Sequence, residues 1–311
     1  MALTAMILYL LRRGAAALLV VWMAVSLAFV VLRWSPGDAV DATMARAGLP
    51  DDEIEARRDE LGLNDPIWQQ YVVYVAGLVR GDLGESLVSQ QPVSEMIAQN
   101  FGPTAALAFC ALLVAVILGV GLGAMASLPR WAGVRYAAEA IASLTLSTPV
   151  YWTSTLAIYL FTIVLGLLPG VGGQGLRYLI LPVTVLGFHT AGSIARVTAE
   201  SIRDAAKQDF VRTARAKGLR DRQVLYHILR VGLLPVLAVV ALQLGFLLGG
   251  AVITETIFVR RGLGRVLLTA VNNRDYPVIQ GLVGLSAILY SLIHLIADAL
   301  YRLFDPRVEM D

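Results

Sequence analysis

Few side chains in this sequence could catalyse a reaction or ligate a metal ion. Three histidines and one cysteine, Cys110, are too few and too scattered for a structural zinc site or a nucleophile–base pair. The sequence also lacks a Gly-x-x-x-x-Gly-Lys-Ser/Thr phosphate loop, because neither of its lysines, Lys207 and Lys217, follows such a glycine pattern. We therefore expect no catalytic residue, no metal site and no cofactor bound by this chain.

The most distinctive spacing occurs in a basic segment, residues 209–218, where cations alternate with small residues. The pattern predicts an amphipathic helix that stops at Gly218, because helix C-termini favour a glycine with positive φ. A second helix should follow and lead into the apolar segment that contains Pro235. Small side chains would let a partner approach closely, and the cations could pair with its acidic groups. The residues of this candidate contact are Arg212, Thr213, Ala214, Arg215, Ala216, Lys217 and Gly218.

Three polar side chains in apolar segments are candidates for the lining of a pathway, since polar groups at membrane depth are costly and often functional. Glu255 either faces a pathway, where it would meet an amine or a cation, or pairs with Arg260 or Arg261. His189 either lines a pore or bonds to a neighbouring helix, and Gln243 is open to the same two interpretations.

Two further acidic residues in apolar segments are interpreted as structural. Glu139 begins its segment where solvent or Arg135 can reach it. Asp298 lies one helical turn from His294, and the spacing predicts that these two side chains pair.

The elements that carry these residues must lie in a membrane. Of the 311 residues, 57% are hydrophobic and 15% are charged, and the mean hydropathy is +0.69. A soluble domain has about 25% charged residues, so the apolar content exceeds what one core can bury. The net charge of +2 gives no signal for polyanion binding, and we expect no nucleic-acid partner.

Six apolar segments are long enough to cross a bilayer as helices, which predicts an all-α, polytopic membrane protein. They are residues 14–32, 104–126, 136–165, 179–195, 231–258 and 277–301. Pro149 interrupts the third segment, either as a hinge or as a static kink. Glycines in the second and fifth segments should permit close helix packing, namely Gly119, Gly121, Gly123, Gly245, Gly249 and Gly250.

The distribution of basic residues places both termini in the cytoplasm. The 196–230 loop has nine Lys/Arg against four Asp/Glu, whereas residues 34–103 have twelve Asp/Glu against four Lys/Arg. One outer loop opposes this orientation, because residues 259–276 hold four arginines and one aspartate. The expected organisation is a cytoplasmic N-terminus with the first membrane helix (1–33), an extracytoplasmic insertion (34–103), a five-helix core that includes the cytoplasmic loop 196–230 (104–301) and a cytoplasmic tail (302–311).

The insertion should contain two helices. The first starts at Pro50, with acidic residues in its first turn, and ends at Gly62. The second spans residues 67–79 and places Trp68, Tyr71 and Tyr74 on one face. These aromatics either pack against the membrane or the rest of the insertion, or they form a docking surface for an outer partner.

The order of several motifs resembles that of the B-type permease subunits of dipeptide, oligopeptide and nickel ABC importers. The 209–218 segment resembles their EAA loop, with Arg212-Thr213-Ala214 at the Glu-Ala-Ala positions and Gly218 as the motif glycine. The other motifs are Arg33-Trp34-Ser35-Pro36-Gly37-Asp38, Leu61-Gly62-Leu63-Asn64-Asp65-Pro66, Gly81-Asp82-Leu83-Gly84-Glu85-Ser86, residues 249–258, Gly262-Leu263-Gly264-Arg265, Asn273-Arg274-Asp275-Tyr276-Pro277 and Asp305-Pro306-Arg307.

The resemblance implies a type I ABC importer permease in a bacterial cytoplasmic membrane, with residues 212–218 as the helix that couples it to ATPases. The implied partners are a second, C-type permease, two ATPase subunits or one fused ATPase, and an extracytoplasmic substrate-binding protein. ATP and Mg²⁺ would bind to the ATPases, and the binding protein would dock within 34–103. The implied cargo is a peptide, with nickel or a metal chelate as the alternative.

A different class is an ATP-independent secondary transporter. Such a protein would show inverted repeats, broken helices and charge relays in the membrane. The sequence shows neither repeats nor a charge relay, and the 209–235 segment has no role in that class.

Overall fold

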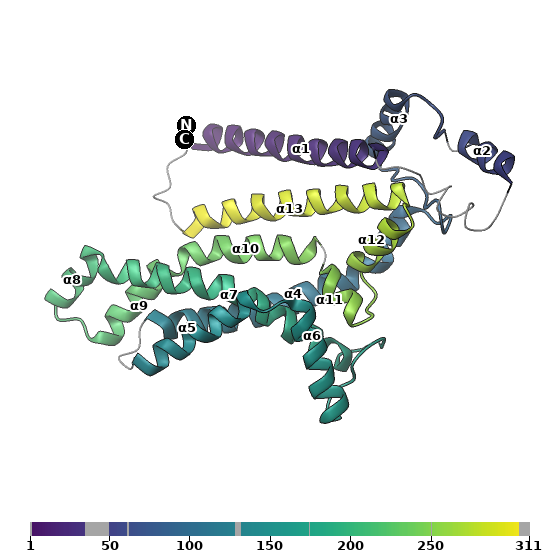
Figure 1. Cartoon of the computed structure of the whole chain (residues 1–311). Helices are drawn as coiled ribbons and strands as arrows, with labels where there is room; N and C mark the ends of the chain where they lie inside the picture. The colour runs from purple at the N-terminus through teal and green to yellow at the C-terminus, as the bar shows by residue number, and fades with distance from the viewer. Residues whose placement is uncertain are drawn as a thin grey trace.

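The computed structural model describes residues 2–34, 50–60, 62–127, 132–173, 175–249 and 251–304, and nearly all of them are helical (Figure 1). The helices in chain order are α1 (Ala2–Trp34), α2 (Asp51–Glu60), α3 (Ile67–Val79), α4 (Val93–Ser127), α5 (Ala132–Ser147), α6 (Val150–Ile158), the π-helical turn η2 (Tyr159–Val164), α7 (Arg177–Lys207), α8 (Asp209–Ala216), α9 (Asp221–Gly232), α10 (Leu234–Leu248), α11 (Val252–Ile257), α12 (Leu263–Asn272) and α13 (Tyr276–Phe304). The all-α class expected from the sequence is confirmed. Residues 35–38, Leu61, Gly250 and residues 305–311, which carry parts of the quoted motifs and of the expected tail, lie outside the described residues.

Four of the six predicted spans are continuous helices in the part of the chain that the structure describes. They are α1, α4, α7 and α13, each long and apolar enough to cross a membrane. The pair α9–α10 is long and apolar enough for a fifth crossing only if the two helices count as one span, and it bends by 43° where Leu233 joins them. Pro235 lies at the start of α10 and has no N–H to continue the hydrogen bonding of α9. The predicted fifth span reached Phe258, but α10 stops at Leu248 and α11 forms a separate short helix.

The predicted third span, 136–165, is divided into two helices instead of one kinked helix. α5 ends at Ser147, and Pro149 precedes α6 with an extended backbone (ψ 137°). The ring of a proline disfavours helical geometry at the residue before it, here Thr148, so the helix must end there. The Thr148 N–H and hydroxyl both donate to the Leu144 carbonyl, at 3.1 Å and 2.7 Å, and so hold the last turn of α5.

The centre of the molecule is the close packing of α4 against α7. Gly119 and Gly123 of α4 face Ile194 and Thr198 of α7. A Cβ atom at Gly119 would lie 2.7 Å from Ile194 Cβ, and one at Gly123 would lie 2.5 Å from Thr198 Cβ. Gly121 points into open space instead. Small residues therefore let the two backbones approach at the first two positions, as expected, but not at the third.

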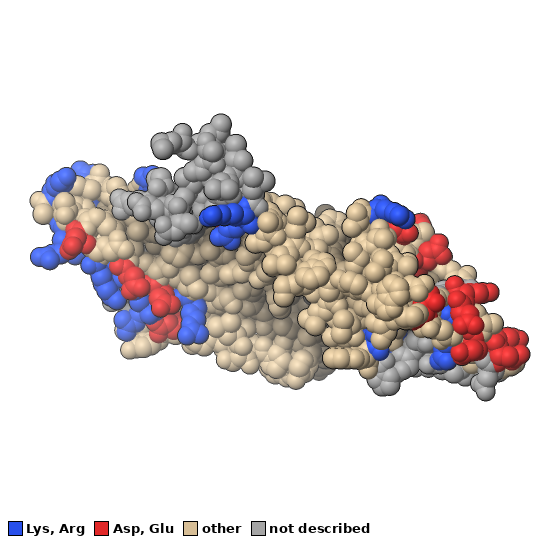
Figure 2. Space-filling model, turned by 90° about the horizontal axis from the view of Figure 1, so that it is seen from above, with Lys and Arg blue, Asp and Glu red and all other residues tan. Residues whose placement is uncertain are grey.

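The long helices give the molecule two distinct ends, and we name each by its elements. The coupling end carries α8 and α9, and the insertion end carries α2, α3 and α12 (Figure 1). Figure 2 shows that most lysines and arginines lie at the coupling end, that acidic side chains gather at the insertion end, and that uncharged residues cover the middle. An uncharged belt between two charged ends is the surface expected of a chain that spans a membrane.

The two predicted helices of the insertion are present as α2 and α3. Two of the three aromatics of α3 pack against α1: the Phe29 ring lies 5.3 Å from the Tyr71 ring and 5.6 Å from the Tyr74 ring. The Tyr71 hydroxyl also lies 2.6 Å from Ser26 Oγ, and burial raises the pKa of the Tyr74 phenol. Trp68 remains 69% exposed. Tyr71 and Tyr74 therefore pack, but against the first membrane helix and not against the membrane surface or the rest of the insertion as predicted.

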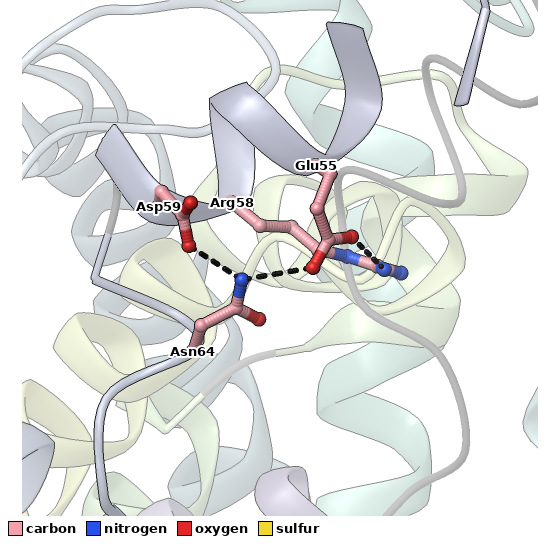
Figure 3. Close-up of polar contacts among 4 residues, drawn as sticks. All are labelled: Glu55, Arg58, Asp59 and Asn64. Carbon is pink, nitrogen blue, oxygen red and sulfur yellow. Dashed lines mark hydrogen bonds and ion pairs between the residues drawn. The ribbon is translucent and has the colours of Figure 1, made fainter. Parts of the chain in front are cut away.

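A polar cluster holds the turn after α2 (Figure 3). The Asn64 amide donates to Glu55 Oε1 at 3.0 Å and to Asp59 Oδ1 at 2.6 Å. Arg58 pairs with Glu55 at 3.2 Å on the same helix. Asn64 thereby folds the chain back on α2 and leaves its acidic side chains at the surface.

Candidate functional site

The basic segment forms the helix–turn–helix unit that its sequence predicts. α8 is followed by Gly218, whose φ is +76°, and then by α9. The Leu219 N–H donates to the Ala214 carbonyl at 3.2 Å, and the Gly218 N–H donates to the Arg215 carbonyl at 2.9 Å. These two bonds form a Schellman motif, which requires a left-handed residue at the glycine position. A rigid turn therefore fixes the direction in which α8 points.

The apolar side of α8 is attached to the bundle. Val211 is buried in a cluster with Ile202 of α7 and with Val224 and Ile228 of α9. The candidate residues on its other side are exposed, with Ala214 alone half-buried. In the described part of the chain, the exposed cations of α8 form no ion pair with a carboxylate. The structure thus presents Arg212, Thr213, Arg215, Ala216, Lys217 and Gly218 as one accessible surface.

Glu255 is fully buried at the insertion end. It attracts Arg260 electrostatically but forms no ion-pair contact with Arg260 or Arg261. The Thr104 hydroxyl donates to Glu255 Oε1 at 2.6 Å, and the Arg265 backbone N–H donates to Oε2 at 3.1 Å. Thr104 Oγ1 in turn accepts the Leu263 N–H at 2.8 Å. The carboxylate therefore joins α11, α4 and the N-terminus of α12, where the helix dipole favours a negative charge. The direct ion pair with Arg260 or Arg261 is replaced by this network, and pathway lining by Glu255 stays a prediction.

Two glycines make room for this carboxylate. A Cβ atom at Gly262 would overlap the Glu255 carboxyl group, and one at Gly264 would lie 2.7 Å from Val252 Cα and 3.0 Å from Glu255 Oε2. The sequence motifs 249–258 and 262–265 are thus parts of one packed unit. Thr104 belongs to the same unit, and sequence analysis missed it because its partners lie more than 150 residues away.

His189 lies between two helices. Its Nε2 is 2.6 Å from Thr153 Oγ1 of α6, and its Nδ1 is 3.0 Å from the Thr145 carbonyl of α5. The histidine therefore bridges both sides of the break at Pro149. Gln243 is half-buried on α10.

Glu139 and Asp298 each form an ion pair, but not with the residue predicted from the sequence. Glu139 pairs with Arg203 of α7 at 2.9 Å and not with Arg135. Asp298 pairs with Arg13 of α1 at 2.9 Å, whereas His294 Nδ1 donates to its own helix. In both cases a helix packed alongside supplies the partner, and spacing along one helix carries no information about it.

A second buried carboxylate fastens the insertion to the core. Asp275, which follows α12, accepts hydrogen bonds from the Ser86 hydroxyl and from the Leu87 N–H at 3.1 Å. Within the described residues, no three His, Cys, Asp or Glu side chains lie together as a metal site would require. The buried carboxylates therefore act as acceptors that join segments distant in the sequence.

A helical bundle with an uncharged belt between two charged ends is the architecture of a multi-pass membrane protein. Residues 115–310 match the family described as the inner membrane component of binding-protein-dependent transport systems. Residues 6–108 match the N-terminal family of the same membrane components. The chain belongs to this family of transport permeases, which are membrane subunits of multi-component systems.

Curated relatives cover almost the whole chain. The glutathione transport system permease protein GsiC of Escherichia coli O6:H1 is 38% identical over 283 residues, which cover 91% of this chain and 92% of the relative. The dipeptide transport system permease protein DppB of Escherichia coli K12 is 35% identical over 314 residues, which cover 91% of this chain and 93% of the relative. These matches confirm the recognised family, the B-type permeases of peptide ABC importers.

Solved structures share the fold. The inward-facing MetNI methionine ABC transporter aligns with a TM-score of 0.54 at 17% identity, over 67% of this chain and 96% of the other. An amino acid ABC transporter crystallised with histidines aligns with a TM-score of 0.51 at 19% identity, over 69% and 95%. The bundle is therefore an ABC importer permease fold, and about a third of this chain lies outside the shared part.

Proposed function

We propose that this chain forms half of the translocation pathway of an ATP-driven peptide importer. Two relatives that match over nine-tenths of the chain are permeases named for glutathione and for dipeptides, which supports a short peptide as the cargo. The observation that carries the proposal is the α8–α9 unit, an accessible basic surface on a turn of fixed geometry. A surface of this kind suits a rigid contact that passes motion between subunits.

The partners in this proposal are a second permease, two ATPase domains and an extracytoplasmic binding protein. ATP and Mg²⁺ bind to the ATPases, which seat α8 in a cleft and pair with Arg212, Arg215 and Lys217. Both termini and the coupling end face the cytoplasm. The insertion end faces outward, and the acidic surface of α2 there supports docking of the binding protein.

The experiment is peptide uptake by proteoliposomes that contain the assembled complex and its binding protein. Gly218→Trp should abolish uptake while ATP hydrolysis continues, because a bulky side chain would separate α8 from its partner surface. Gly218→Ala is the matched control: no atom lies within 4 Å of its Cβ position, and it should cost about 1 kcal/mol of stability with coupling intact.

Normal uptake by Gly218→Trp in an assembled complex would contradict the coupling role. Uptake of nickel or a nickel chelate, with no uptake of peptides, would keep the architecture and replace the cargo.

A further inference from the structure

Three arginines at the insertion end line one open cleft of about 470 Å³. All come from the 259–276 segment that opposed the orientation inferred from the sequence. The cleft lies between the N-terminal part of α4, the loop before α7 and the segment that joins α11 to α12. Its lining residues are Gln99, Pro103, Gly172, Gly173, Gly175, Val259, Arg260, Arg261 and Arg265, so no carboxylate lines it.

The positive charge of this arginine cleft is not balanced by ion pairs. In the described part of the chain, none of the three guanidinium groups pairs with a carboxylate. Glu255 lies behind the cleft and attracts Arg260 electrostatically, but it forms no ion-pair contact with it, and its two oxygens are bonded to Thr104 and to the Arg265 backbone. The charges of Arg261 and Arg265 therefore remain for a ligand. Arg260 Nη1 donates to the Tyr178 carbonyl at 3.2 Å, but its buried Nε has no partner. Arg261 and Arg265 are exposed.

The backbone that presents these arginines is strained. Val259 has φ +50°, a left-handed conformation that costs a β-branched residue about 1–2 kcal/mol. The Val259 and Arg260 N–H groups close a Schellman turn onto Thr256 and Glu255, at 3.1 Å and 2.8 Å. The Glu255 network therefore holds a turn that directs the arginines into the cleft, and such strain is found most often at functional sites.

We propose that the arginine cleft binds the C-terminal carboxylate of the transported peptide, an inference that rests on the proposed function. A guanidinium group binds a carboxylate through two parallel hydrogen bonds, and several of them together favour an anion over an amine or a metal ion. The volume lies within the roughly 300–1,000 Å³ typical of small-ligand sites. Gln99 adds an amide that can bond the peptide backbone.

The test compares a peptide with a free C-terminal carboxylate and the same peptide with a C-terminal amide. Uptake is measured in proteoliposomes that contain the whole complex and saturating binding protein. For the double variant Arg261→Gln/Arg265→Gln, the ratio of wild-type to variant uptake efficiency should be about ten for the acid peptide and near one for the amide. The binding protein is the same in every assay, so its own preference cancels from this ratio.

Two controls separate charge from structure. Arg261→Lys/Arg265→Lys keeps both charges and should recover most of the acid-peptide uptake. Arg177→Gln removes an exposed arginine that does not line the cleft. The ratio of wild-type to variant uptake should be near one for both peptides.

Equal losses for both peptides would overturn the inference in favour of a binding-protein contact or a structural role. A ratio of wild-type to variant uptake near one for both peptides would overturn the inference as well. Either result would leave the proposed function unaffected. A wild-type complex that takes up neither peptide would reject the proposed function, and the inference with it.

Discussion

The Thr104 hydroxyl makes two hydrogen bonds in a fully buried place, and each connects a different element to α4. It accepts the Leu263 N–H and donates to Glu255. Both partners would lose their bond if the hydroxyl were removed, because Thr104 is only 1% exposed and solvent does not reach the site. An unmet buried polar group costs about 1–3 kcal/mol.

Thr104→Val should therefore lower the stability of the permease by about 1–3 kcal/mol, although the side chain keeps its shape. Thr104→Ser keeps the hydroxyl and should lose much less. Thermal unfolding of the purified protein in detergent measures both variants. Equal melting temperatures for Thr104→Val and the wild type would show that the hydrogen bonds of Thr104 do not stabilise the outer segments.

At the scale of single residues, the sequence shows which acidic side chains need a bonding partner, but it does not show which residues those partners are. Glu255 was recognised as a costly buried charge, but it bonds to a hydroxyl on α4 and a backbone amide on α12. Glu139 and Asp298 have cationic partners, but on neighbouring helices. Spacing along a helix predicts pairs within that helix only, and contacts between helices depend on packing that one sequence does not reveal.

Among the elements, the contact between α4 and α7 depends on which face of α4 carries a glycine. Gly123→Ala should destabilise the bundle by about 1–3 kcal/mol, because its Cβ would lie 2.5 Å from Thr198 Cβ and 2.6 Å from the Ala195 carbonyl. Gly121→Ala is the matched control on the same helix. It meets nothing within 4 Å and should leave stability unchanged or slightly higher. Thermal unfolding of both variants in detergent checks this, and equal losses would contradict the assigned packing face.

Element boundaries were predictable where local chemistry sets them. Pro66 and Gly218 begin and end helices as proline and glycine usually do, so α3 and α8 were placed correctly. The interruption at Pro149 was predicted as a hinge or a kink, but the complete separation of α5 from α6 and the early end of α10 were not. An apolar run looks the same whether it forms one helix or two, and contacts such as those of His189 with α5 and α6 decide the outcome.

At the scale of the whole molecule, the distribution of charge supports the orientation in the membrane predicted from the sequence. Acidic side chains cover the insertion end and basic ones the coupling end (Figure 2). Arg222 on α9 and Glu53 on α2 are exposed at opposite ends and serve as reporters of sidedness. With Cys110→Ser as background, Glu53→Cys should react with a membrane-impermeant maleimide in spheroplasts. Arg222→Cys should react only after lysis, and the reverse pattern would contradict cytoplasmic termini.

One helix connects the two ends. α7 is continuous over 31 residues, from Arg177 beside the arginine cleft to Lys207, and a single residue separates it from α8. At about 1.5 Å per residue it is a rod of about 46 Å. A tilt of about 5° about one end of such a rod displaces the other end by about 4 Å, roughly three-quarters of the 5.4 Å rise of a helical turn. α7 can thus act as a lever that turns a small movement of α8 into a change of width at the cleft.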